Sequence, residues 1–207
     1  MGQAVDPGKV RGTAHGLRVA QLSGLGKPPR LQPVIVENWP KSLSLGDFRK
    51  VPEAEAREGI LSTREGKVSY RLKATYKPAK ARLGNSLTTK NIRVAVVLAR
   101  EHTWVMVGPG RKLSDVDLLH HEQGHYDIGG LVARELGYRM RFIFGTDESA
   151  VDIAVRTARG KADKKAKLLN ENYDNETNHG QDSKEQRRWD DMIRTAIEEK
   201  KNLPDPK

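Results

Sequence analysis

The sequence of 207 residues contains no cysteine. Disulfide bonds and thiolate metal sites are therefore excluded, and any metal ion must be held by histidine and carboxylate side chains. Aromatic residues make up only 5% of the chain, too few for an obvious base-stacking platform, and no nucleic-acid-binding signature occurs. We therefore expect no specific nucleic-acid partner.

Long apolar runs are also missing. No stretch approaches the roughly 18 apolar residues of a membrane-spanning helix, so we expect no membrane span. The first 30 residues lack the apolar core of a secretory signal. The expected location is the cell envelope or the exterior if the chain is a processed form, and the cytoplasm otherwise. A net charge of +10 favours anionic partners.

The sequence His-Glu-Gln-Gly-His at residues 121–125 is the main chemical motif. On a helix, His121 and His125 lie about 40° apart around the axis, so both imidazoles can reach one metal ion. Glu122 would then stand beside the open coordination position, where a carboxylate can take a proton from an activated water molecule. This HExxH pattern is typical of zinc peptidases.

The residues around the motif favour an amphipathic helix. Ser114 is a suitable N-cap residue, with Asp117 three positions later. An apolar stripe continues the face of the two histidines, and Gly137 predicts the end of the helix; the stripe consists of Leu118, Ile128 and Val132.

The rest of the chain predicts an α+β fold. We expect a mobile arm over residues 1–30, one domain over residues 31–199 and a tail over residues 200–207. Residues 31–110 read as mainly β, with a half-buried strand over 67–77 and a central strand over 91–100, whereas residues 111–199 read as mainly α. The predicted architecture is zincin-like: a small antiparallel or mixed sheet, then the motif helix and two further helices.

The two further helices have recognisable boundaries. After an extended segment at 138–144, Thr146 predicts the cap of a helix that Gly160 interrupts. The lysine-rich run 161–167 reads as a solvated helical face. The last helix begins near Asp182 or Ser183 and has one apolar face, made by Trp189, Met192, Ile193, Ala196 and Ile197.

A catalytic zinc ion needs a third protein ligand. His179 follows in a polar, turn-like segment that a loop could bring over the motif helix. Glu148 is the alternative, because it starts a Glu-x-x-x-Asp arrangement on the next helix that also suits a zinc site. Spacing alone does not separate the two.

Two motifs together resemble an uncharacterised bacterial family of predicted secreted zinc-dependent proteases. They are His-Glu-Gln-Gly-His-Tyr-Asp-Ile at 121–128 and Tyr-Asp-x-x-Thr-x-His-Gly at 173–180, followed by Gln186 and Trp189. The resemblance covers residues 68–197, and it points to His179 as the third ligand.

Other residues of the motifs have candidate roles. Tyr173 is a candidate donor to a tetrahedral oxyanion, and Asp174 or Asp127 could accept the second N–H of a ligand histidine. Gln186 and Trp189 are expected to pack beneath the site.

The predicted protein is thus a zinc metallopeptidase acting on protein or peptide substrates, with Glu122 as general base. The alternative is a non-catalytic zincin-like or structural-zinc module that binds an anionic partner through its basic surface. The sequence does not identify the substrate or the oligomeric state.

Overall fold

The fold is seen in a computed structural model whose described residues are 34–58, 65–81 and 86–206. Most strands of the two β-sheets come first in the chain, and three long helices follow with one short strand between the first two, so the predicted α+β class is confirmed. The predicted N-terminal arm lies outside the described residues.

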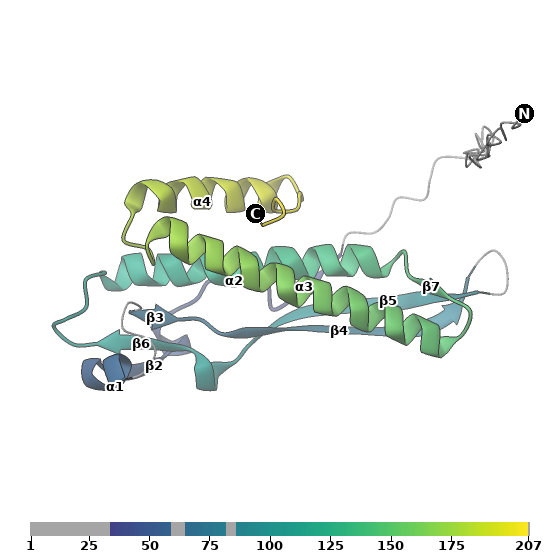
Figure 1. Ribbon diagram of the computed structural model, residues 1–207, viewed down its shortest axis with the longest axis horizontal. Coiled ribbons are helices and arrows are strands. Elements are labelled where there is room, and N and C mark those ends of the chain that lie inside the picture. Colours follow the sequence, from purple (N-terminus) through teal and green to yellow (C-terminus); the bar gives the residue numbers. More distant parts are fainter. Residues whose placement is uncertain (1–33, 59–64, 82–85, 207) are drawn as a thin grey trace, which may run out of the picture. The chain divides into compact units, whose positions relative to one another are not determined.

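The main sheet is built on its two longest strands, β4 (Tyr70–Lys80) and β5 (Leu87–Leu98), which pair in antiparallel fashion. β1 (Val36–Glu37) lies parallel to β5 on its other side, and β7 (Phe144–Gly145) pairs antiparallel with the start of β5. The sheet is therefore mixed, with β5 in the centre and β4 at an edge (Figure 1).

A second sheet of three strands has the order β2-β6-β3. β2 (Arg49–Pro52) is parallel to β6 (Trp104–Val107), and β3 (Gly66–Lys67) is antiparallel to it. The short helix α1 (Glu53–Glu58) follows β2, and two 3₁₀ turns, Leu45–Asp47 and Arg100–His102, precede β2 and β6.

Three long helices follow: α2 (Asp115–Met140), α3 (Glu148–Thr177) and α4 (Ser183–Glu198). α2 packs on β5 and on α3, whereas α4 packs on α2 and α3. In Figure 1, α2 lies between α4 and the main sheet, and α3 runs obliquely across the view from beside α4 to β7. None of the described helices combines the length and apolar character that a bilayer crossing requires.

Several local predictions are confirmed. Alternate residues of β4 face inward, as the pattern at 67–77 predicts. Ser114 caps α2 by accepting a hydrogen bond from the Asp117 N–H (3.1 Å). Asp182 caps α4 in the same way, and Trp189 on the predicted apolar face of that helix is buried.

The prediction that Gly137 ends the motif helix is wrong. α2 continues to Met140, and Gly137 is buried near Val34 and β5. A Cβ atom at this position would lie 2.5 Å from Val34 Cγ1 and 3.2 Å from Val94 Cγ2. The glycine therefore allows close packing of the helix on the sheet. Of the extended segment predicted at 138–144, only Phe144 is in a strand.

The predicted interruption of the next helix at Gly160 is also wrong. α3 is continuous over 30 residues, and its N-cap is Asp147 rather than Thr146. Its C-terminal turns include Tyr173 and Asp174, which belong to the segment 173–180 that the sequence predicts to be turn-like. These side chains are therefore presented by a helix that packs along α2.

Candidate metal centre

The first half of α2 brings His121 and His125 to one face, as the motif predicts. Their rings are in edge-to-face contact, with centroids 4.8 Å apart. Both residues are buried, and Glu122 between them is only 2% exposed. The sequence therefore predicted correctly that His121 and His125 share one face of α2.

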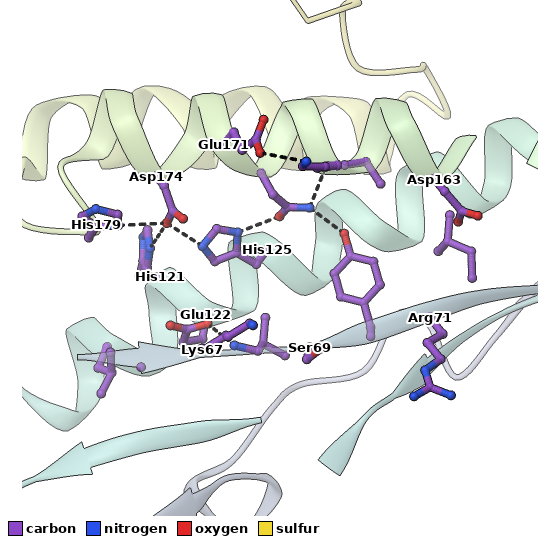
Figure 2. Close-up of a pocket in the computed structure, with 18 of the residues that line it drawn as sticks. Lys67, Ser69, Arg71, His121, Glu122, His125, Asp163, Glu171, Asp174 and His179 are labelled. Carbon is purple, nitrogen blue, oxygen red and sulfur yellow. Dashed lines mark hydrogen bonds and ion pairs between the residues drawn. The ribbon is translucent and has the colours of Figure 1, made fainter. Parts of the chain in front are cut away.

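The end of α3 adds a carboxylate between the two rings. Asp174 Oδ1 lies 3.2 Å from His121 Nε2 and 2.9 Å from His125 Nε2. His179, just beyond the helix, has its Nδ1 3.3 Å from the same oxygen. Figure 2 shows Asp174 among the three histidines. The three residues whose ligand atoms all lie within 4.8 Å of one another are His121, His125 and Asp174.

An amide side chain orients the ring of His125. Asn170 Oδ1 lies 2.6 Å from His125 Nδ1. The Asn170 Nδ2 group donates instead to the Tyr70 hydroxyl (2.7 Å) and to the Ala166 carbonyl (2.7 Å). Because an amide oxygen only accepts, His125 Nδ1 must carry the hydrogen, and Nε2 of the neutral ring presents its lone pair to Asp174.

The ring of His121 is oriented in a similar way by α4. Gln186 Oε1 lies 3.1 Å from His121 Nδ1, and Gln186 Nε2 donates to the Tyr173 hydroxyl (2.6 Å) and to Asp190 Oδ1 (2.9 Å). The Nε2 atom of neutral His121 therefore also presents a lone pair to Asp174.

Two imidazole lone pairs and one carboxylate oxygen thus converge on one buried point. Such an arrangement is unfavourable unless a cation separates the donors. A proton is the simplest such cation. Burial lowers the pKa of His125, but the hydrogen bond to Asp174 and the charges of Glu122 and Asp174 outweigh it and raise the pKa.

The donor set also fits a metal ion. Ligand atoms that share a tetrahedral zinc ion at 2.0–2.2 Å are about 3.3 Å apart, and the nitrogen–oxygen separations here are 3.2 and 2.9 Å. Each ligand histidine has its second nitrogen fixed by a hydrogen-bond acceptor, as is usual at metal sites. A buried His121, His125 and Asp174 group can therefore hold a metal ion.

Glu122 lies on the sheet side of this group. Its Oε2 accepts a hydrogen bond from the Val68 N–H (2.6 Å), in the segment between β3 and β4. Oε1 has no hydrogen-bond partner among the described residues. One oxygen of the carboxylate is therefore anchored and the other is left to accept a proton.

The last residues of the second motif are held by backbone geometry. Asn178, His179 and Gly180 all have positive φ angles (48°, 54° and 82°) and end α3. A Cβ atom at Gly180 would lie 2.9 Å from Cγ of the His121 ring. Glycine therefore lets the chain turn closely over one candidate ligand and place His179 beside Asp174.

The structure contradicts the prediction for Tyr173. Its side chain is completely buried, its hydroxyl donates to the His121 carbonyl (3.1 Å), and its ring stacks on His121. It does not line the adjoining cavity. Tyr173 therefore positions His121 and Gln186 and is not placed to contact a substrate oxyanion.

The structure also separates the other candidates from the site. Glu148 is exposed at the start of α3, 26 residues and about 39 Å of helix from Asp174. Asp127 accepts from Trp39 Nε1 (2.8 Å) rather than from a histidine. The alternative of Glu148 as third ligand is therefore wrong.

A cavity of about 570 Å³ opens beside the candidate metal group. His121, Glu122, His125, Asp174 and His179 line one end. From there the cavity follows α3 and the edge strand β4, and its wall includes residues 67–72 of the sheet side and residues 159–171 of α3. The candidate metal group is thus buried in the protein but borders a space large enough for a ligand.

The chain matches no protein-family model, and searches of curated proteins and of solved structures return no match. Function is therefore inferred from the geometry of the site.

Sequence reasoning missed Asn170 and understated Asp174. Asn170, Tyr173, Asp174 and Thr177 have the i, i+3, i+4, i+7 spacing of one helix face, and they continue the buried stripe of Ala162, Ala166 and Leu169. That spacing could have predicted a helix carrying these residues on one face. The prediction was missed because polar residues near a glycine and several asparagines are also typical of a loop.

Proposed function

We propose that the protein is a zinc-dependent metallopeptidase with a zincin-like arrangement of sheet and motif helix. The observation that carries the proposal is the convergence of His121 Nε2, His125 Nε2 and Asp174 Oδ1 at the end of a cavity that Glu122 also lines. In this proposal Asp174 replaces His179 as the third ligand. The sites of catalytic zinc ions have three protein ligands and an open position, which agrees with a cavity at this point.

The choice of zinc follows from the donors and from Glu122. Two imidazoles and one carboxylate suit Zn²⁺, and they also suit Fe²⁺ in oxygenases. A glutamate next to the first histidine is the group that hydrolysis requires, because a water molecule must lose a proton as it attacks. The combination therefore favours a hydrolytic zinc site.

A zinc ion held here would supply a Lewis acid that activates water and polarises the scissile carbonyl. Glu122 would accept the water proton at Oε1, since Oε2 is anchored by the Val68 N–H. The same carboxyl group would then return the proton to the leaving amine. Asn170 and Gln186 would keep both imidazoles in the tautomer that presents Nε2.

His179 is the candidate donor to the reacting carbonyl oxygen in place of Tyr173. It lines the cavity, its side chain is 21% exposed, and its Nδ1 faces Asp174 Oδ1 at 3.3 Å, so Nε2 is the ring nitrogen that would donate to a substrate. A donor that strengthens its hydrogen bond as charge develops lowers the barrier to attack.

The substrate would lie along β4. β4 is at the edge of the main sheet, whereas β5 is its central strand and has partners on both sides. Ser69 O accepts from the Ala99 N–H, so by alternation the backbone groups of Tyr70 and Leu72 point away from β5. These groups border the cavity, where an extended peptide could add as a further strand.

A structural-zinc module is the second candidate. His179 Nδ1 is close enough to Asp174 (3.3 Å) that a modest shift would close the site with four protein ligands. The basic surface would then be the functional part. The two proposals differ in whether His179 is needed to hold the metal.

The substitution Glu122→Gln tests catalysis. We expect the variant to bind zinc normally and to lose peptide hydrolysis by at least about 10²-fold, with Glu101→Gln, an exposed glutamate, as the matched control. Hydrolysis of a peptide library would be followed by mass spectrometry. Equal turnover in Glu122→Gln and Glu101→Gln would refute the mechanism.

The substitution His179→Ala separates the two candidates. For the peptidase we expect one zinc ion per chain and a loss of turnover of about 10²-fold. For the structural module, zinc affinity itself would fall. Metal analysis and activity measured on the same preparation give both values.

A further inference from the structure

A second cavity lies between α2 and α3 and is separate from the candidate metal centre. This α2–α3 groove has a volume of about 650 Å³ and is lined by the second half of α2, residues 142–143, residues 154–168 of α3 and the chain end at 205–206. Its floor is apolar core: Val132, Leu136 and Ala162 are at most 8% exposed. Phe142, 64% exposed, also lines the groove.

Apolar side chains continue beyond the lip of the groove. Phe144 and Ile153 are 58% and 54% exposed, which is unusual for side chains of this size. Ile153 shares a face of α3 with Thr157 and Lys164, four and eleven positions later. A lysine therefore lies on the same face of α3, about 16 Å farther along the helix.

The rim of the groove is basic. It carries four cations, Arg139, Lys161, Lys164 and Lys165, and two anions, Glu135 and Asp205. Both anions are neutralised, since Lys165 bridges them (2.9 and 2.6 Å) and Arg139 also pairs with Glu135. Lys161 and Lys164 are exposed and make no ion pair within the described part of the chain. The rim thus has two free positive charges one helical turn apart.

The chain after α4 borders one part of the groove. Asp205 and Pro206 line it, and Leu203 beside them is 4% exposed, with its carbonyl accepting from Lys165 Nζ (3.3 Å). The volume falls within the range of single small-molecule sites. A groove of this size suits one flexible hydrocarbon chain, and the two free lysines at its rim suit an anionic headgroup on that chain.

We propose that the α2–α3 groove binds a single-chain anionic amphiphile, of which a fatty-acid anion is the simplest. The hydrocarbon chain would cover Val132, Leu136 and Ala158, and the headgroup would meet Lys161 and Lys164. Apolar burial supplies the affinity, and the free lysines select a negative headgroup. This site is independent of metal binding and of peptide hydrolysis.

The first test compares soluble amphiphiles by titration calorimetry on the full chain. Laurate should bind with a stoichiometry of one, octanoate more than about tenfold more weakly because four buried methylene groups are lost, and dodecylamine not measurably. Equal affinity for laurate and dodecylamine would overturn the proposal, because the rim would then have no role.

The second test changes the rim and the floor separately. Lys161→Glu with Lys164→Glu should weaken laurate binding about tenfold. Lys73→Glu with Lys90→Glu, two exposed lysines of the main sheet, makes the same change in net charge and should have no effect. Ala158→Phe should fill the groove and block binding, with circular dichroism and thermal unfolding confirming the fold. Identical laurate affinity in both lysine pairs would contradict the proposal.

The third test distinguishes a soluble ligand from a membrane surface. Sedimentation with vesicles of anionic lipid should leave the protein in solution if the groove takes a free amphiphile. Binding to vesicles without binding of laurate would overturn the assignment and indicate a membrane-docking surface.

Discussion

The two cavities along α2 and α3 differ in the chemical character of the side chains that line them. Beside the candidate metal centre, His121, His125 and Asp174 converge within hydrogen-bond distance, and amide side chains fix the outer nitrogens of both rings. The lining of the α2–α3 groove is mainly hydrocarbon, and its charged groups pair with one another except for Lys161 and Lys164 at the rim. The same two helices therefore carry one site whose binding depends on the orientation of polar side chains, and one whose binding depends on the apolar area it can bury.

The two sites should respond differently to substitutions in their walls. When a histidine ring rotates, its lone pair no longer points at the metal position. Small displacements should therefore greatly weaken metal binding at the candidate metal centre. Apolar contacts have no preferred direction, so the groove should tolerate similar changes of volume or shape. Substitutions matched between the two halves of the helix pair can test this contrast.

The largest effect is expected from Gly124→Ala. A Cβ atom at Gly124 would lie 2.6 Å from Tyr173 Cζ, within the rigid stack against His121. We expect a loss of unfolding free energy of about 3 kcal/mol together with weaker zinc binding, measured by urea unfolding and zinc titration.

Gly160→Ala is the matched control for that substitution. Gly160 lies within α3 and nothing is within 4 Å of its Cβ position. Because alanine is the better helix former, the control should be stabilised by about 0.5–1 kcal/mol. Similar destabilisation by both substitutions would contradict the close packing at the metal centre.

A smaller effect is expected from Gln186→Leu. The substitution removes the acceptor for His121 Nδ1 and the donor to Tyr173. Loss of such a partner typically lowers metal affinity about 10–100-fold. Gln186→Glu keeps an acceptor and should retain most of the affinity, which a competition titration with a zinc chelator would measure. If leucine and glutamate have the same effect, Gln186 only fills space.

The smallest effect is expected at the groove, from Lys165→Met. Burial lowers the pKa of Lys165, but hydrogen bonds to Asp205 and Glu135 outweigh it and raise the pKa. A raised pKa means that Lys165 stabilises the fold below its ordinary pKa and that this contribution is lost as the pH rises through the folded value. Lys165→Met should therefore cost about 1 kcal/mol or less at pH 8.

The pH dependence gives the check on that prediction. The stability difference between wild type and Lys165→Met should shrink above pH ~10.5, as measured by urea unfolding. Lys73→Met, at an exposed lysine of β4, is the control and should show no comparable trend. A difference that grows with pH would mean that the ion pairs do not stabilise the fold.

The sequence predicted the elements whose signals are local. Ser114 as a cap, the HExxH helix and the apolar face of α4 around Trp189 all depend on spacing within one helix, and the structure contains each. The alternation along β4 was equally readable. The α+β class follows from the order of these elements.

The remaining features depend on contacts between distant segments. Glycine is typical of helix ends, but Gly137 lies inside α2, where the absence of a side chain lets the helix pack closely against Val34. Asn170 and Asp174 look like solvent-facing residues of a polar segment, and only the antiparallel packing of α3 on α2 turns them toward His125. Tyr173 was assigned a role at the substrate because its burial could not be read from one chain.

Zinc binding by the wild-type protein and by Asp174→Ala tests the central claim most directly. Bound metal would be removed with a chelator, and the protein would then be titrated with Zn²⁺. The number of zinc ions per chain would be measured by native mass spectrometry. The proposed centre predicts one zinc ion per wild-type chain and a loss of affinity of at least about 10²-fold in Asp174→Ala. Wild-type protein that binds no zinc, or an Asp174→Ala variant that binds it equally well, would contradict the account.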